Sequence, residues 1–148
     1  MDTAESTIEA YREAWNAMNF SALLRLWDHS EAEIYYLAEE FEKPMVSLDE
    51  VSKYFDLTTA AVESVQLWVD GLNLKPLADD LQVATFDMHV DASLTGSAAR
   101  GVRPLGIDVR VSSILRQREG QWRFIHYVEA PLGALPFVRR AYQANTRG

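Results

Sequence analysis

The chain has 148 residues, a length that suits one domain, residues 1–148, with a single hydrophobic core. Its net charge of −8 disfavours nucleic acids and anionic membrane surfaces as partners, because both are bound through clustered Lys and Arg. The chain contains no cysteine, which excludes disulfides and thiolate chemistry. No apolar run is long enough for a membrane span, and the acidic N-terminus lacks the pattern of a secretory signal. We therefore expect a cytoplasmic protein.

Three helices and one strand are predicted in the first 60 residues. Residues 2–18 place apolar side chains at helical spacing, and Asp2 with Glu5 has the spacing of a capping box. Residues 20–27 predict a second, short helix. Residues 47–60 predict a third helix, which Ser47 and Glu50 would cap. The stretch EAEIYYLAEEF, residues 31–41, predicts a strand centred on residues 34–38.

Four consecutive strands are predicted next, followed by a short helix near the C-terminus. The strands are residues 62–72, 80–94, 106–118 and 121–130. Residues 73–79, NLKPLAD, are interpreted as a hairpin connection because they contain a proline. In the tail, Pro136 suits the first turn of a helix whose apolar side is formed by Leu135, Val138 and Tyr142. Helices followed by a run of strands predict an α+β fold, with helices on one face of an antiparallel sheet.

Strict alternation along residues 121–130 assigns His126 to the apolar face of the sheet, together with Phe124. There His126 would act as a general acid or base or would donate to a ligand carbonyl. The alternative is a core histidine bonded to a nearby acceptor. The assignment assumes that the strand has no β-bulge, since a bulge before His126 would exchange its face with that of Tyr127.

Other candidate site residues lie where strand 31–41 ends and on the predicted apolar faces. Glu39 and Glu40 end that strand, and Glu40 is the one predicted to point inward as a base or as a partner of a histidine. The alternative for both is a solvated acidic loop. A pocket for a flat apolar ligand would be lined by aromatic and thioether side chains, for which plain core packing is the alternative: Tyr11, Trp15, Tyr36, Tyr54, Met88 and Phe124.

The opposite sheet face is predicted to be polar with a few large side chains, which favours a homodimer interface. Its charged members are Asp87, His89, Asp91, Asp108, Arg110 and Arg123, and its large members are Trp68, Ile125 and Tyr127. A metal site at Asp87, His89 and Asp91 is disfavoured because arginines are available to pair with these side chains. The chain has neither a phosphate-binding loop nor a G-x-S-x-G nucleophile motif. We expect no metal and no cofactor.

Three stretches resemble the NTF2-like superfamily with its cystatin-like fold, in particular the SnoaL-like branch. They are IEAYREAWNAMNFSALLRLW, VSLDEVSKYF and GQWRFIHYVEA, and together they span nearly the whole chain. The resemblance implies a curved sheet wrapped around helices into a cone with an apolar pocket at its wide end. It also implies dimers that pack through the outer sheet face.

Members of this superfamily include isomerases, dehydratases, polyketide cyclases, epoxide hydrolases, kinase association domains and transport factors. Enzymatic relatives commonly place carboxylates or a His–Asp pair inside the cone, whereas alternation assigns no carboxylate to the inner strand face here. Our hypothesis is an isomerase-, dehydratase- or cyclase-type acid–base protein that binds an apolar or aromatic small molecule through His126 and Glu40. The alternative is a non-catalytic homo-oligomerisation module with a filled core. A cavity of roughly 300 Å³ or more would favour the first.

Overall fold

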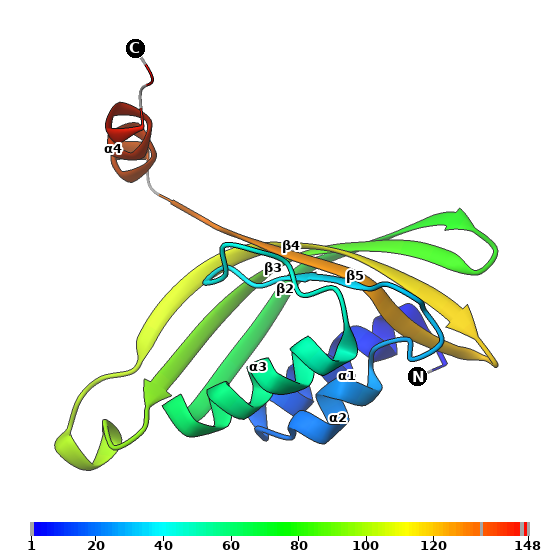
Figure 1. Ribbon diagram of the computed structural model, residues 1–148, viewed down its shortest axis with the longest axis horizontal. Helices are drawn as coiled ribbons and strands as arrows, with labels where there is room; N and C mark the ends of the chain where they lie inside the picture. The colour runs from blue at the N-terminus through cyan, green and yellow to red at the C-terminus, as the bar shows by residue number, and fades with distance from the viewer. Residues whose placement is uncertain (1, 134, 146, 148) are drawn as a thin grey trace.

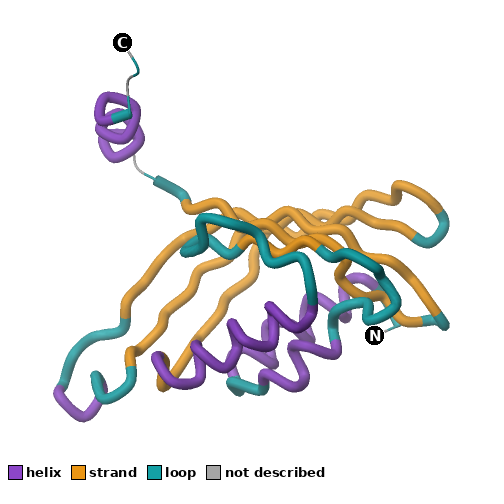
Figure 2. Tube along the Cα trace, in the orientation of Figure 1, coloured by secondary structure: helices purple, strands orange, loops and turns teal. Residues whose placement is uncertain are grey.

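The computed structural model describes residues 2–133, 135–145 and 147. Three helices lie along one face of a twisted five-stranded sheet, as Figures 1 and 2 show. The elements are α1 (Ala4–Asn16), α2 (Phe20–Arg25), β1 (Tyr35–Leu37), α3 (Leu48–Ala61), β2 (Val62–Ala78), β3 (Leu81–Leu94), a 3-10 turn (Ala98–Arg100), β4 (Leu105–Arg118), β5 (Gln121–Pro131) and α4 (Leu135–Ala144). None of the helices among the described residues is both long enough and apolar enough to cross a bilayer.

Side-chain caps fix where the first and third helices begin. The predicted Asp2–Glu5 cap of α1 is wrong, because the capping box is formed one residue later by two hydroxyls. Thr3 Oγ1 accepts from the Ser6 N–H at 3.0 Å, and Ser6 Oγ accepts from the Thr3 N–H at 3.1 Å. Ser47 caps α3 as predicted, with its Oγ accepting from the Glu50 N–H at 3.2 Å. The predicted capping box is not completed, because the Glu50 carboxylate accepts from the Val46 N–H rather than from that of Ser47.

The strand order is β1-β5-β4-β3-β2, in which β2 to β5 form an antiparallel meander. The predicted α+β architecture, with its helices on one face of the sheet, is confirmed. β1 runs parallel to β5 at one edge, so the sheet is mixed rather than wholly antiparallel. This pairing brings the chain that follows β1 beside the C-terminal half of β5.

The predicted hairpin connection at residues 73–79 is wrong. These residues continue β2 as far as Ala78, and the turn consists of Asp79 and Asp80. The strand tolerates Pro76 because β2 is an edge strand, where a missing backbone N–H interrupts no central ladder. The pairing with β3 shifts register before this segment, between Asp70 and Asn73, and again within it, between Pro76 and Ala78.

A β-bulge in β5 changes which of its residues face the helices. Ile114 pairs with His126 while its neighbour Leu115 pairs with Phe124, so Ile125 is the extra residue. Phe124 and Tyr127 are both fully buried, and the half-buried His126 turns away and stacks on Tyr35 with ring centroids 4.8 Å apart. The predicted inward position of His126 is therefore wrong, as is the outward position of Tyr127.

The hydrophobic core lies between the helices and the inner sheet face, with Trp27, Tyr36, Phe124 and Tyr127 among its fully buried members. In Figure 1, α4 lies apart from the sheet and the three other helices. On its predicted apolar side Tyr142 is exposed and Val138 is half-buried, while the side chain of Leu135 falls outside the described residues.

Candidate functional site

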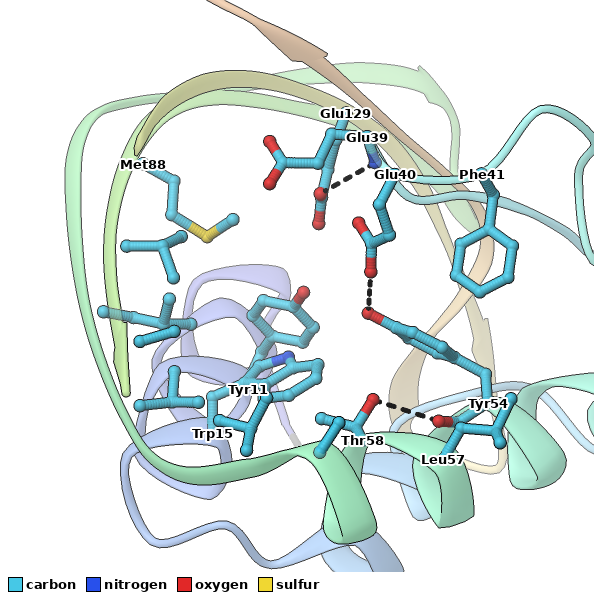
Figure 3. A pocket seen from close by; sticks show the side chains of 16 residues that line it. Tyr11, Trp15, Glu39, Glu40, Phe41, Tyr54, Leu57, Thr58, Met88 and Glu129 are labelled. Atoms are coloured by element: carbon cyan, nitrogen blue, oxygen red, sulfur yellow. Dashed lines mark hydrogen bonds between the residues drawn. The ribbon is translucent and has the colours of Figure 1, made fainter. Parts of the chain in front are cut away.

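A cavity of about 340 Å³ opens between the inner sheet face, α1, α3 and the turn that follows β1 (Figure 3). Its wall is mainly aliphatic and aromatic, with carboxylates gathered at one end. The lining residues are Tyr11, Trp15, Glu39, Glu40, Phe41, Tyr54, Leu57, Thr58, Ala61, Val62, Val65, Leu67, Met88, Val90, Ala92 and Glu129. An apolar enclosure with a few convergent polar groups is the usual form of a small-molecule site.

Three carboxylates converge at one end of this cavity. Glu39 and Glu40 belong to the turn after β1, and Glu129 comes from β5 beyond the bulge. One oxygen from each of the three lies within 4.8 Å of the other two. The Glu39 N–H donates to Glu129 Oε2 at 3.4 Å, whereas Glu39 Oε2 is buried with no hydrogen-bond partner among the described residues. This spacing is also one in which three carboxylates can hold a metal ion.

Burial of Glu129 raises the pKa of its carboxyl group to about 8, and the negative charges of Glu40 and Glu39 act in the same direction. Protein atoms surround most of this side chain, while part of its surface faces the cavity. Burial also raises the pKa of Glu39, with a smaller contribution from Glu40. With a pKa of about 8, the Glu129 carboxyl group is mostly protonated at pH 7 and can both lose and regain its proton near that pH.

Tyr54 holds the third carboxylate in place. Its hydroxyl, carried by α3, donates to Glu40 Oε1 at 2.6 Å. Burial raises the pKa of Tyr54 well above its ordinary value, and the charge of Glu40 raises it further, so the hydroxyl stays a donor at all ordinary pH values. Glu40 is therefore oriented by α3 although it sits in a turn.

The aromatic wall beside the carboxylates comes from α1. Burial raises the pKa of Tyr11, and so does the charge of Glu129, so that its hydroxyl remains protonated. Trp15 is only 7% exposed, and a hydrogen-bond contribution from its side chain opposes the rise in the pKa of Tyr11. In Figure 3 the indole nitrogen lies on the edge of the ring nearer to the carboxylates.

The predicted site residues separate into two groups. Glu40 and four of the six predicted pocket residues line the cavity: Tyr11, Trp15, Tyr54 and Met88. Tyr36 and Phe124 lie in the core instead, and their rings pack against Trp27 at 5.1 and 5.7 Å. His126 is not among the lining residues, and no histidine of the described part of the chain is.

The carboxyl group that sequence reasoning missed is Glu129. Strict alternation places it on the outer face, and only the bulge at Ile125 turns it inward. The inward position of Glu129 could have been predicted from a bulge before His126. A one-residue bulge there exchanges the faces of His126 and Tyr127, and it turns Glu129 inward as well.

A second polar cluster lies on the outer sheet face, on the opposite side of the sheet from the cavity. His89 Nδ1 is 2.6 Å from Asp108 Oδ1, and His89 Nε2 is 3.0 Å from Asp91 Oδ1. Both hydrogen bonds raise the pKa of His89, and the bond to Asp108 has the larger effect. The half-exposed Trp68 lies beside this histidine, with ring centroids 5.6 Å apart.

Solved structures share this fold, among them proteins described as NTF2-like or as having a cystatin-like fold. An NTF2-like candidate dehydratase from Streptomyces avermitilis has a TM-score of 0.76 at 16% identity, covering 88% of this chain and 94% of the other. An uncharacterised cystatin-like protein from Caulobacter vibrioides has a TM-score of 0.71 at 14% identity, covering 98% and 97%. An NTF2-like superfamily protein from Salmonella enterica serovar Typhimurium has a TM-score of 0.71 at 15% identity, covering 88% and 89%.

The sequence profile of the SnoaL-like domain matches residues 4–132, and the chain therefore belongs to the SnoaL-like domain family. No curated protein matches it. At the identities of the solved structures the likeness is one of fold, so the reaction must be argued from the cavity itself.

Proposed function

We propose that this chain binds an apolar or aromatic small molecule in the cavity and acts on it as an acid–base enzyme of the isomerase, dehydratase or cyclase type. The observation that carries the proposal is Glu129, a carboxyl group with a pKa of about 8 at the wall of a largely apolar cavity. A group that loses and regains its proton near the working pH is the kind that general acid–base catalysis requires.

Two carboxyl groups of the cavity, Glu129 and Glu40, would have different roles in the reaction. Glu129 in its neutral form would donate to a ligand carbonyl or hydroxyl and take a proton back in a later step. Glu40, held by the Tyr54 hydroxyl, would take the proton that the ligand loses from the carbon next to its carbonyl and return it when the carbonyl forms again. Glu129 thus takes over the acid–base role that the sequence assigned to His126.

The cavity disfavours the alternative function, an assembly module with a filled core. Its volume of about 340 Å³ exceeds the roughly 300 Å³ at which ligand pockets begin. Trp15 and Tyr54, two aromatic side chains large enough to fill such a space, line the cavity instead. This supports a binding site over a packed module.

Ligand binding is tested by a thermal-shift screen of aromatic ketones, phenols and aromatic alcohols. A compound at about 100 times its dissociation constant should raise the melting temperature by roughly 5–10 °C. The shift should vanish in Thr58→Phe, which fills the cavity from α3, and persist in Asp56→Phe, which adds the same ring to an exposed position of that helix. A screen without hits, or a hit that Thr58→Phe leaves unchanged, would contradict the proposal.

Catalysis is tested separately, by proton exchange on a ketone that binds. The wild-type chain in D₂O should exchange the protons next to the carbonyl roughly a hundredfold faster than buffer, and Glu129→Gln should lose this rate while still binding. NMR of the ketone measures both. Binding without exchange would make the chain a binding protein rather than an acid–base enzyme.

We further propose a homodimer that packs through the outer sheet face, where Trp68 is 48% exposed beside His89. Light scattering coupled to gel filtration should give the mass of a dimer for the wild type and of a monomer for Trp68→Glu. Leu77→Glu is the matched control, since Leu77 is similarly exposed but lies at the far end of β2. A wild-type monomer would refute the interface.

A cytoplasmic location, like the lack of nucleic-acid and membrane partners, stays a prediction from composition.

A further inference from the structure

The C-terminal helix carries positive charge in an acidic chain. Residues 135–148 contain three arginines and neither Asp nor Glu, although the whole chain has a net charge of −8. Two of these arginines, Arg139 and Arg140, belong to α4 and are exposed, and neither forms an ion pair with another described residue. A helix with unbalanced charge of one sign favours contact with a surface of the opposite sign.

The link to α4 directs the helix away from its own sheet. β5 ends at Pro131, and the N–H of Leu132 still donates to the carbonyl oxygen of Asp108 at 2.8 Å. Only two residues separate Leu132 from Leu135, where α4 begins, so their Cα atoms are at most about 11 Å apart. In Figure 1, α4 lies on the side of the sheet away from α1 to α3, separated from the strands. A molecule packed against the outer sheet face would therefore meet α4.

The outer face of β2 and β3 holds two aspartates that no cation balances. Asp70 and Asp87 are exposed and lie directly opposite each other on these strands, an arrangement in which like charges repel. Arg110 on β4 is the other cross-strand neighbour of Asp87, yet no ion pair joins the two. A cation brought from outside would reduce the repulsion between the two aspartates.

Further acidic side chains surround His89 on the same face. Asp108 and Asp91 hydrogen-bond to its two ring nitrogens, so these three residues keep a net negative charge even when His89 is protonated. The exposed ring of Trp68 lies beside His89, and guanidinium groups stack on aromatic rings. This surface, the acidic patch, consists of Asp70, Trp68, Asp87, His89, Asp91, Asp108 and Arg110.

We propose that α4 of one protomer packs on the acidic patch of a second copy of this chain, with Arg139 and Arg140 against its aspartates. In a dimer with two-fold symmetry the same contact forms twice, because each copy supplies one helix and one patch. The inference rests on the homodimer proposed above in that it needs two outer sheet faces turned toward each other. It adds the helix that joins them.

A second copy fits this helix better than a nucleic acid or an anionic membrane does. Those partners are bound through broad clusters of Lys and Arg, whereas α4 offers two arginines. The link to α4 also begins beside Asp108, so a polyanion bound to the helix would lie close to the acidic patch and be repelled by it. The patch of a second copy meets the same arginines with attraction.

The first experiment measures the dissociation constant of the dimer by sedimentation velocity. Arg139→Asp combined with Arg140→Asp should weaken the dimer about tenfold or more, because the reversed helix repels the patch. Asp70→Lys combined with Asp87→Lys should weaken it similarly. All four changes in one chain should restore the affinity to within about threefold, since opposite charges face each other again. Raising the salt concentration should weaken the wild-type dimer.

A matched control tests whether total charge is the cause. Arg25→Asp combined with Lys43→Asp makes the same change in net charge at exposed positions outside α4 and the acidic patch, and should leave the dimer unchanged. Asp70 also accepts a hydrogen bond from the Gly71 N–H in a turn. If its replacement disturbs folding, Asp87→Lys alone provides the reversed patch.

The second experiment uses cross-linking to show which chain α4 contacts. The chain has no cysteine, so one introduced thiol is unique. A chain with Gln143→Cys in α4 is mixed with a longer, tagged chain that has Gln66→Cys, an exposed position opposite Asp91 on the outer face. A short bismaleimide should join the two chains. Glu33→Cys, exposed but outside that face, should give no such product in place of Gln66→Cys.

The outcomes separate this inference from the proposed homodimer. If reversal of Arg139 and Arg140 leaves the dimer unchanged, the inference fails and the homodimer stands. The same holds if a chain with both Gln143→Cys and Gln66→Cys cross-links only within itself, or if Arg139 and Arg140 serve instead to bind phosphatidylserine vesicles or DNA. A monomeric wild-type chain overturns both proposals, and neither result affects the ligand site in the cavity.

Discussion

At pH 8.5 the Glu129→Gln variant should melt well above the wild-type chain, whereas at pH 5 the two should melt close together. The folded-state pKa of Glu129 is about 8, compared with roughly 4.3 for an unperturbed glutamate. Between these values the folded chain holds a proton that the unfolded chain has released. The wild type therefore loses stability as pH rises from about 4.5 to 8, and glutamine, which never ionises, avoids that loss.

The expected difference at pH 8.5 is on the order of 2–4 kcal/mol, or roughly 5–12 °C in melting temperature. It is measured by thermal unfolding of both chains from pH 5 to pH 9. The difference in melting temperature between the two chains removes the effect of titrating His89 and His126, because both chains contain these histidines. Glu33→Gln should run parallel to the wild type. A Glu129→Gln curve that also runs parallel would show that the carboxyl group is solvated and ionised throughout.

Replacing Phe124 with alanine should cost about 3–5 kcal/mol of folding stability. Its ring is fully buried and packs against Tyr11, Trp27 and Tyr127 at centroid distances of 5.4 to 5.7 Å. The truncation removes these contacts and leaves a void that three large rings cannot readily close. The backbone bonds of Phe124 to Leu26 and Asp28 would remain, so the loss reports on packing.

Urea unfolding at pH 7 measures this loss. Leu105→Ala is the comparison, because Leu105 is 60% exposed and its truncation should change stability by less than about 0.5 kcal/mol. A loss below about 1 kcal/mol for Phe124→Ala would mean that the inner sheet face is not packed as described.

Local patterns were sufficient to predict most of the fold. Helical spacing and Ser47 predict α3, and the order of helices and strands predicts the α+β architecture. Two local errors have clear causes. At the N-terminus several polar residues compete for the capping position, and Thr3 takes it rather than Asp2. In β2, Pro76 signals a turn, but a strand at the sheet edge can accommodate it.

The candidate site was harder to predict, because its key residues depend on long-range geometry. Tyr11, Trp15, Tyr54 and Met88 reach the cavity through regular periodicity, which sequence reveals. Tyr36 and Phe124 follow the same periodicity, yet they lie deeper, and only tertiary packing separates wall from core. The inward position of Glu129 depends on one extra residue in β5. Burial is the main cause of its elevated pKa, and Glu40 and Glu39, about 90 residues earlier in the chain, add to it.

The bulge at Ile125 divides β5 into two segments of opposite parity. Before it, even-numbered residues face the helices, and after it, odd-numbered residues do. Any alignment of this strand with a relative that lacks the extra residue therefore needs a one-residue gap at Ile125. Without that gap, His126 would be matched with inward-facing residues and Glu129 with outward-facing ones, and a catalytic role carried over by position would pass to the wrong side chain.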